Sequence, residues 1–317
     1  MMGRYVAGES PAMDRLVEET IKGVGAEIGA MRIPRLRGVV LGGGYGRGEG
    51  GVFEAPGGIQ RLYNDLDFFA VTEDGASGRD IDVIAAALAP ISRRWTGKLG
   101  IDVDFVVRTP WRMRHDQERV MIQELLHGYF DVAGEPGVEM FRGMERRDPG
   151  AFPWSEAARQ LMNRGMGLAF ASVSDDADFA ARNINKCILG VGDALLIARG
   201  GYRWRAADRA AALGDTLYSA AVEWKFRPRA GAVADWDAAR AAWLDATEKV
   251  LEAGRRTGAL RRTVRQGARW IARRRTLGSL RTLGFPPAAR ILVPLAEAIR
   301  GRRAVSASLT ADWKVFN

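Results

Sequence analysis

The sequence has few of the residues and segments on which several classes of protein depend. It contains a single cysteine, Cys187, which excludes an internal disulfide framework and suits a reducing compartment. The N-terminal stretch MMGRYVAGESPAMDRLVEE lacks the apolar core of a signal peptide. The longest apolar run, CILGVGDALLIA, is interrupted by Asp193 and is too short to span a bilayer. We therefore expect a cytoplasmic protein with no transmembrane segment.

Several nucleotide- and metal-binding motifs are also missing. The only two histidines, His115 and His127, have no cysteine near them, which argues against a zinc site. No G-x-x-x-x-G-K-[ST] sequence occurs, so a P-loop is excluded. Residues 46–51 match G-x-G-x-x-G, but VFEAPGG follows instead of a helix, and the chain has no HRD or DFG motif. This match is therefore incidental, and neither a dinucleotide-binding fold nor a protein kinase is expected.

Charge is unevenly distributed along the chain, whose net charge is +9. Residues 1–250 hold 32 Lys and Arg against 35 Asp and Glu, a balance of −3. Residues 251–303 hold 14 Arg against 2 Glu, a balance of +12. Such a basic block indicates either an anionic partner, such as nucleic acid, or a solvated arginine-rich face.

The first 110 residues alternate between helical and extended patterns. Residues 12–31 and 80–95 have the apolar spacing of helices, whereas LRGVVLGGG, NDLDFFAVT (64–72) and GIDVDFVVR (100–108) are typical of buried strands. A helix over 110–130 and a short extended piece, DVAGEP, follow. This order predicts helices around a small sheet.

After RRDPGAFPW (146–154) the patterns become helical. Helices are predicted over 155–173, 177–199, 206–226, 235–254, 257–276 and 286–301. We therefore expect two domains, residues 1–150 and 151–317, the second a helical domain with a basic C-terminal part.

Two short acidic motifs are the strongest chemical signal. Asp65 and Asp67 are two residues apart on one predicted strand, and Asp102 and Asp104 repeat this spacing on another, so each pair points to one face. Placing carboxylates together on a buried strand is costly unless a cation or water receives them. A cluster of this kind suits Mg²⁺, which prefers oxygen ligands and the phosphates of a substrate.

These motifs, taken with the glycine-rich LGGGYGRGEGG (41–51), resemble those of nucleotidyltransferases of the DNA polymerase beta-like superfamily. Relatives of this kind, including aminoglycoside-modifying ones, have a strand, a glycine turn, an acidic pair on the next strand and a third carboxylate on a later strand. The resemblance covers about residues 36–136. It implies an α+β fold, with a small mixed-sheet nucleotidyltransferase domain followed by an α-helical bundle. Two departures are Asn64, where serine is usual, and a longer segment over residues 50–63.

The resemblance also implies roles for particular residues. Asp65, Asp67 and Asp104 would be the catalytic, metal-binding carboxylates, with Asp102 as the rival for the third position. Residues expected to bind the nucleotide are Gly43, Gly44, Arg47, Asn64 and Lys186. The glycines would let backbone N–H groups approach the phosphates. Arg47 would contact phosphate or form a local ion pair with Glu49, and Lys186 would contact the triphosphate or lie on a solvated helix face.

Mg²⁺ or Mn²⁺ and an NTP, with ATP as the first choice, are thus the expected cofactor and co-substrate. The function predicted is transfer of a nucleoside monophosphate to a hydroxyl of a small molecule, with release of pyrophosphate. Two alternatives stay open. One is transfer to RNA or protein, with the Arg-rich 255–275 stretch as the docking surface. The other is a non-catalytic nucleotide-binding or antitoxin-like module.

Overall fold

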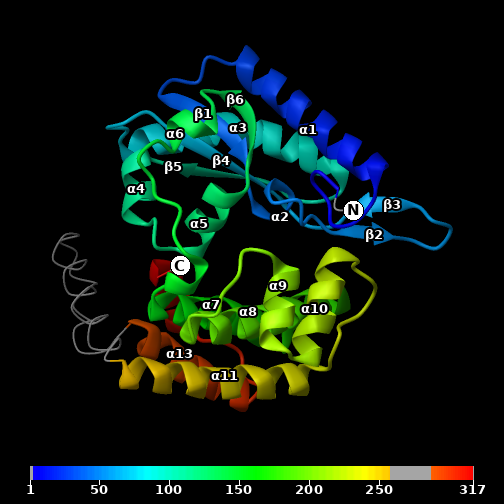
Figure 1. Ribbon diagram of the computed structural model, residues 1–317, viewed down its shortest axis with the longest axis vertical. Helices are drawn as coiled ribbons and strands as arrows, with labels where there is room; N and C mark the ends of the chain where they lie inside the picture. Colours follow the sequence, from blue (N-terminus) through cyan, green and yellow to red (C-terminus); the bar gives the residue numbers. More distant parts are fainter. Residues whose placement is uncertain (1–2, 258–286, 317) are drawn as a thin grey trace. The chain divides into compact units, whose positions relative to one another are not determined.

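The computed structural model describes residues 3–257 and 287–316, which form two compact units. The first unit comprises Met1–Arg147 and Lys225–Arg229, and the second comprises the remaining residues (Figure 1). In chain order the elements of the first unit are α1 (Pro11–Ala30), β1 (Leu36–Leu41), α2 (Gly43–Gly46), β2 (Val52–Glu54), β3 (Gln60–Leu62), β4 (Leu66–Thr72), α3 (Gly78–Leu99), β5 (Val103–Arg108), α4 (Pro110–His115), α5 (Val120–His127), β6 (Phe130–Gly134) and α6 (Gly137–Met140).

A four-stranded mixed sheet in the order β5-β4-β1-β6 forms the centre of the first unit. β4 and β5 are parallel, whereas β1 is antiparallel to both β4 and β6. The parallel pair is joined by α3, as a crossover between parallel strands requires. A separate two-stranded hairpin, β2–β3, lies between the glycine turn and β4 along the chain.

Each face of the sheet has its own apolar core. On one face Leu41, Phe68 and Val103 pack with apolar residues of α1 and α3. On the other, Phe69 and Val71 pack with buried residues of α4, α5 and α6. Phe68 and Phe69 thus enter opposite cores, because successive side chains of a strand point to opposite faces of the sheet.

Local sequence signals explain where the crossover helix α3 begins and ends. The Ser77 side chain accepts a hydrogen bond from the Asp80 backbone, while the Asp80 side chain accepts one from the Ser77 N–H, which is a capping box. At the other end Gly100 adopts a left-handed conformation with φ of 70°, which suits glycine. The helix is thus longer than the predicted 80–95, and its existence and its place between the two strands are confirmed.

The second unit is helical. Its elements are the 3₁₀ turn η1 (Pro149–Ala151) and the helices α7 (Trp154–Ala171), α8 (Ala177–Ala198), α9 (Ala206–Leu213), α10 (Thr216–Phe226), α11 (Trp236–Arg256), α13 (Pro287–Arg300) and α14 (Ala307–Phe316). The last residues of α10, Lys225 and Phe226, belong to the first unit. Tryptophans tie the helices together, since the indole N–H groups of Trp236 and Trp243 donate to the Leu168 and Leu161 carbonyls of α7. The predicted α+β class, with a small mixed sheet followed by a helical bundle, is confirmed.

The structure corrects several predicted boundaries. The helix expected over 110–130 is two helices, because Thr109 caps α4 and the chain turns over Asp116–Arg119 before α5. The helix expected over 206–226 is broken where Gly214 takes a left-handed conformation that ends α9. The short extended piece expected at DVAGEP is confirmed, since its first four residues belong to β6. Residues 258–276 of the predicted helix 257–276 lie outside the described residues.

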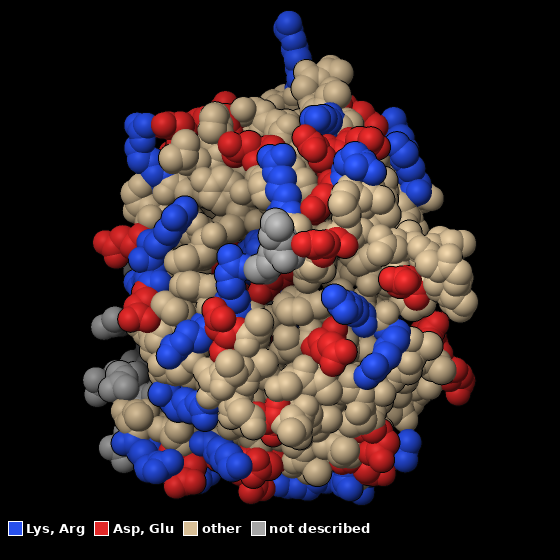
Figure 2. All heavy atoms as spheres, turned by 45° about the vertical axis from the view of Figure 1, so that its right-hand side comes forward, with Lys and Arg blue, Asp and Glu red and all other residues tan. Residues whose placement is uncertain are grey.

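No helix in the described part of the chain is long and apolar enough to cross a membrane. Charged side chains of both signs are interspersed over the face drawn in Figure 2. Most of the arginine-rich 255–275 stretch lies outside the described residues, so its expected role as a docking surface stays a prediction.

Candidate active site

Two neighbouring strands hold Asp67 and Asp104 side by side. The register of the parallel β4–β5 pair places Asp67 opposite Asp104, with Leu66 opposite Val103. Residues paired across two strands point to the same face of the sheet. That face is the one covered by α4, α5 and α6, because Phe69 and Val106, two residues further along each strand, pack against the core there.

Asp65 and Asp102 lie just before these strands. The Leu66 N–H donates to the Asp102 carbonyl over 2.9 Å, so the two chains remain paired at this end. Partial burial raises the pKa of Asp104, and the carboxylates of Asp102 and Asp65 raise it further. The end of the β4–β5 pair therefore concentrates negative charge, which a cation would offset.

The glycine turn approaches this acidic end very closely. The Gly42 N–H donates to the Asp67 carbonyl over 2.8 Å, which extends the β1–β4 pairing into the turn. Gly43 has a φ of 63°, and a Cβ atom at this position would overlap the Oδ2 atom of Asp67. Both the backbone conformation and the lack of space require glycine at position 43.

The turn presents backbone donors. Gly43 and Gly44 begin α2, whose first N–H groups have no intrahelical acceptor, and Gly42 provides no side-chain cap. Within the described part of the chain these two N–H groups have no acceptor. They are thus available to an oxygen anion close to Asp67.

Tyr45 and Asn64 fix the turn to the start of the hairpin and of β4. The buried Tyr45 hydroxyl donates to the Gly51 carbonyl over 3.1 Å and accepts from the Tyr63 N–H over 3.2 Å. Burial raises the pKa of Tyr45, so the phenol stays protonated and can donate. The Asn64 side-chain oxygen accepts from the Gly51 N–H over 2.6 Å. Asn64 thus holds the turn, and its expected contact with the nucleotide stays a prediction.

The turn carries two charged residues, Arg47 and Glu49, which belong to a chain of ion pairs of alternating sign. Arg47 lies 3.2 Å from a carboxylate oxygen of Glu124 on α5 and 3.7 Å from the Oε2 atom of Glu49. The same Oε2 accepts a hydrogen bond from the Lys225 ammonium over 2.9 Å. The Glu49 side chain is 1% exposed. Of the two roles expected for Arg47, the ion pair with Glu49 is present, and contact with phosphate stays a prediction.

The remaining sequence candidate, Lys186, lies on α8 in the second unit, so its proximity to the turn stays a prediction. Nearby on the same helix, Asp193 pairs with Arg209 over 2.9 Å and accepts from the Tyr218 hydroxyl over 2.6 Å, so it is a partnered acid of the helical core. Cys187 is buried, and burial raises its pKa to about 12, which leaves the thiol protonated and unreactive.

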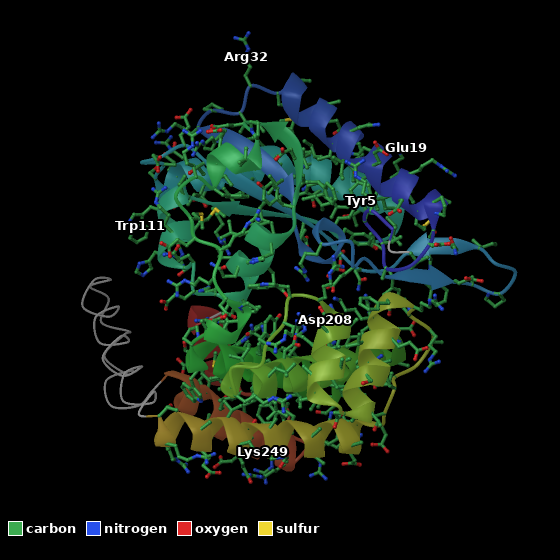
Figure 3. The ribbon with its side chains drawn as sticks, in the orientation of Figure 1. Tyr5, Glu19, Arg32, Trp111, Asp208 and Lys249 are labelled. Atoms are coloured by element: carbon green, nitrogen blue, oxygen red, sulfur yellow. The ribbon has the colours of Figure 1, made fainter. Side chains whose placement is uncertain are left out.

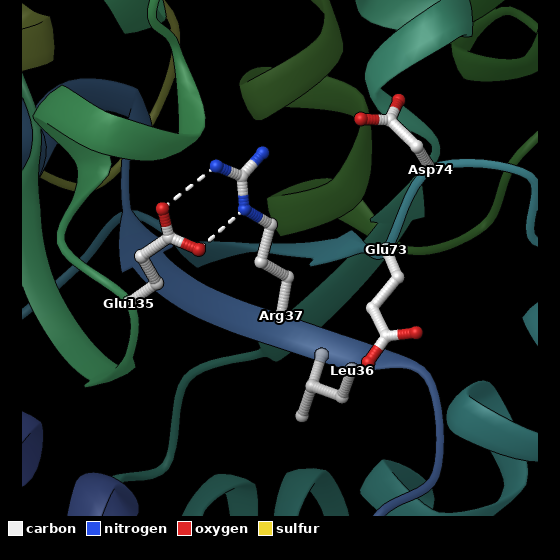
Figure 4. A pocket seen from close by; sticks show the side chains of 5 residues that line it. All are labelled: Leu36, Arg37, Glu73, Asp74 and Glu135. Carbon is white, nitrogen blue, oxygen red and sulfur yellow. Dashed lines mark hydrogen bonds and ion pairs between the residues drawn. The ribbon is translucent and has the colours of Figure 1, made fainter.

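The opposite end of the sheet is a second place where acidic residues gather. An open hollow of about 380 Å³ is lined there by Leu36, Arg37, Glu73, Asp74 and Glu135 (Figure 4). Its acids face arginines: Arg37 makes a two-pronged contact with Glu135 over 2.5 and 2.7 Å, and Arg35 contacts Glu73 over 2.8 Å. The Arg37 guanidinium lowers the pKa of Glu135.

The acidic end by the glycine turn fits a magnesium ion in its chemistry, since its donors are carboxylate oxygens. Among the described residues, however, no group of three or more His, Cys, Asp or Glu side chains lies close enough together to hold a metal ion. Magnesium is typically held by one or two carboxylates, with water and substrate phosphates completing its ligands. The in-register pair Asp67 and Asp104 matches that smaller requirement.

Comparison with known proteins gives a distant result. The chain matches no family model and no curated protein. Among solved structures it is similar to the spectinomycin adenyltransferase AAD(9) from Enterococcus faecialis, determined with ATP and spectinomycin. The two share 13% sequence identity, and the similarity covers 76% of this chain and 99% of that chain with a TM-score of 0.40. So remote a similarity identifies neither the activity nor the ligands of this chain.

The sequence did not indicate every residue that builds this region. Tyr45, Glu124 and Lys225 were not among the candidates, although each contacts the turn or its charged residues. An aromatic residue within a glycine run was a usable signal for Tyr45, because glycines leave room for one large side chain to anchor a loop. No local signal marked Lys225, which contacts Glu49 from 176 positions away.

Proposed function

We propose that the protein is a Mg²⁺-dependent nucleotidyltransferase that moves a nucleoside monophosphate from an NTP, with ATP as first choice, to a hydroxyl of a small molecule. The observation that carries the proposal is the in-register pair Asp67 and Asp104 beside a glycine turn with two available N–H groups. The first unit, described above, would be the catalytic domain.

The proposed roles follow from position. The N–H groups of Gly43 and Gly44 would bind oxygens of the triphosphate, whose negative charge suits a row of backbone donors. Asp65 and Asp67 would hold the metal, and Asp104 would hold it and accept the proton of the attacking hydroxyl. The metal, when bound, would stabilise charge on the attacking and leaving oxygens. Lys186 would provide further positive charge for the triphosphate.

The small-molecule acceptor is preferred to RNA or protein because no observation on the described residues favours a macromolecule. The basic stretch on which that alternative depends lies mostly outside them. A non-catalytic nucleotide-binding module would bind NTP without turning it over, so it is separated from the proposal by the assay below.

Nucleotide binding is tested first, by thermal melting of the protein with each NTP and Mg²⁺ or Mn²⁺. A ligand that binds only the folded state raises the melting temperature, and the NTP with the largest rise is the preferred one. Turnover is then measured as transfer of the label from NTP labelled at the α-phosphate, over a panel of hydroxyl-bearing small molecules.

Asp67→Asn is the decisive variant, because it removes one carboxylate charge without changing the size of the side chain. We expect label transfer to fall by about 100- to 1,000-fold or more, as for other groups that stabilise charge in a transition state. Asp82→Asn, the same chemical change at an exposed position of α3, is the matched control and should retain full activity. Equal transfer by wild type and Asp67→Asn would contradict the proposal, and binding without transfer to any acceptor would favour the non-catalytic module.

A further inference from the structure

The carboxylate of Glu49 is shared between two cations that come from distant parts of the chain. Its Oε2 atom lies 2.9 Å from the Lys225 ammonium and 3.7 Å from Nε of Arg47. The Arg47 Nε is buried and has no hydrogen-bond acceptor among the described residues. Lys225 is therefore closer to this oxygen than Arg47, and Arg47 is held at a distance longer than a hydrogen bond.

Glu49 is also part of the glycine turn itself. Its backbone N–H donates to the Gly44 carbonyl over 2.8 Å, and its own carbonyl oxygen lies 3.4 Å from where a Cβ atom of Gly44 would be. A displacement of Glu49 would thus be passed directly to Gly44. Gly43, the residue before Gly44, lies against the Asp67 side chain, which limits its movement.

Lys225 contacts the same region a second time, through its backbone. A Cβ atom added at Gly51 would lie 2.5 Å from the Lys225 carbonyl oxygen and 2.5 Å from the Asn64 side-chain oxygen. Gly51 in turn accepts the hydrogen bond from the Tyr45 hydroxyl. The segment Lys225–Arg229 therefore contacts the turn at both ends of residues 49–51, once by an ion pair and once by close backbone packing.

A buried ion pair is not needed for packing alone, because apolar side chains of similar size fill such a space at least as well. Charged partners do fix one arrangement, since each must keep its counter-ion in place. If Lys225 is removed, Arg47 remains as a cation near Oε2, and closing the 3.7 Å gap would move Glu49 toward it.

We infer that Lys225 is a positioning residue for nucleotide binding. It holds Glu49 away from Arg47, and so keeps the Gly43–Gly44 donors in place for the phosphates. This inference rests on the proposed function, because the ligand of those donors is the triphosphate. Lys225 itself acts through Glu49 and does not contact the ligand.

The test compares Lys225→Met with Lys249→Met. Lys249, labelled on α11 in Figure 3, makes a lysine–carboxylate contact of 2.7 Å with Asp245, but both side chains are more than half exposed. Binding of Mg²⁺ and an ATP analogue that resists cleavage at the α-phosphate is measured by calorimetry. We expect Lys225→Met to weaken binding about 10- to 100-fold, the range found for groups that orient another ligand. Lys249→Met should bind as wild type does, and Lys225→Arg, which keeps the charge, should restore most of the affinity.

A second measurement separates positioning from general damage to the fold. Hydrogen exchange of the free protein should become faster in Lys225→Met over the peptide containing residues 42–49, and stay unchanged over α3. Where Lys225→Met does not fold, the double variant Glu49→Gln/Lys225→Met, which removes the buried carboxylate charge as well, takes its place in both measurements.

The outcomes are distinguishable. Wild-type affinity in Lys225→Met, or faster exchange over α3 as much as over the turn, would overturn this inference and leave the proposed function intact. A wild-type protein that binds no NTP would overturn the proposed function and this inference together. Weakened binding with faster exchange confined to the turn supports both.

Discussion

At the two ends of the same sheet, the pKa values of acidic residues are shifted in opposite directions. At the end lined by Arg37 and Glu135, the acid is matched by an arginine, and the guanidinium lowers the pKa of Glu135. At the end by the glycine turn, burial and neighbouring carboxylates raise the pKa of Asp104. The first arrangement favours the charged form of the acid, whereas the second disfavours the charged form of Asp104. Acidic residues of one sheet thus respond to their surroundings in opposite directions, and the acidic end by the glycine turn is the one that the proposed function uses.

The largest effect is expected where the glycine turn meets the acidic end. Gly43→Ala places a methyl group against the Asp67 carboxylate at a φ of 63°. We expect a loss of about 2–5 kcal/mol in the free energy of unfolding, from the left-handed backbone together with overpacking, and loss of nucleotide binding. Chemical denaturation and calorimetry measure the two.

Gly58→Ala is the control for this variant. Gly58 also has a positive φ, 78°, but a Cβ atom there would meet nothing within 4 Å. It should cost only the backbone strain of about 1–2 kcal/mol and leave binding intact. If the two alanine variants behave alike, the close approach of the turn to Asp67 is unimportant.

Asp104→Asn should make the protein more stable near neutral pH, although it removes a proposed catalytic group. The raised pKa means that the folded state disfavours the charged form of Asp104. The stability this acid provides when protonated is present below its ordinary pKa of 3.8 and is lost as the pH rises through the folded-state value. The melting temperature of Asp104→Asn should therefore exceed that of wild type at neutral pH, and the gain should vanish at about pH 4 or lower. A lower melting temperature at neutral pH would contradict the contrast between the two ends.

Glu135→Gln should have the opposite and smallest effect. Because the pKa of Glu135 is lowered, its contribution is present above the ordinary value of 4.5 and is lost as the pH falls through the folded-state value. We expect a modest drop in melting temperature at neutral pH, since the pair is partly exposed, and no difference from wild type in strong acid. Nucleotide binding should be unaffected, and any loss of binding would show that this end also serves the ligand.

Much of the fold could be predicted because its central elements are strongly patterned. β4 contains the apolar run 68–71 and β5 the apolar run 105–107, and α3 has a regular apolar spacing with a capping box. The hairpin β2–β3 was missed because strands of three residues are too short to show a period. The break after α4 was missed because the turn over Asp116–Arg119 contains neither glycine nor proline.

The candidate site was partly readable for similar reasons. The spacing of each acidic pair predicted a shared face, but whether Asp102 or Asp104 lies opposite Asp67 depends on strand register, which only the folded sheet defines. The contact between Lys225 and Glu49 depends on the chain returning to the first unit after a long excursion through helices. No local periodicity in the sequence marks the place where the chain returns to the first unit.

The register of β4 and β5 also limits how this protein can change in length. Side chains alternate between faces along a strand, so a shift of β5 by one residue against β4 would turn Asp104 toward the opposite core. At the tip of the β2–β3 hairpin, added atoms at Gly57 and Gly58 would meet nothing within 4 Å. Added residues are therefore compatible with the hairpin tip, whereas insertions within β4 or β5 would break the pairing of Asp67 with Asp104.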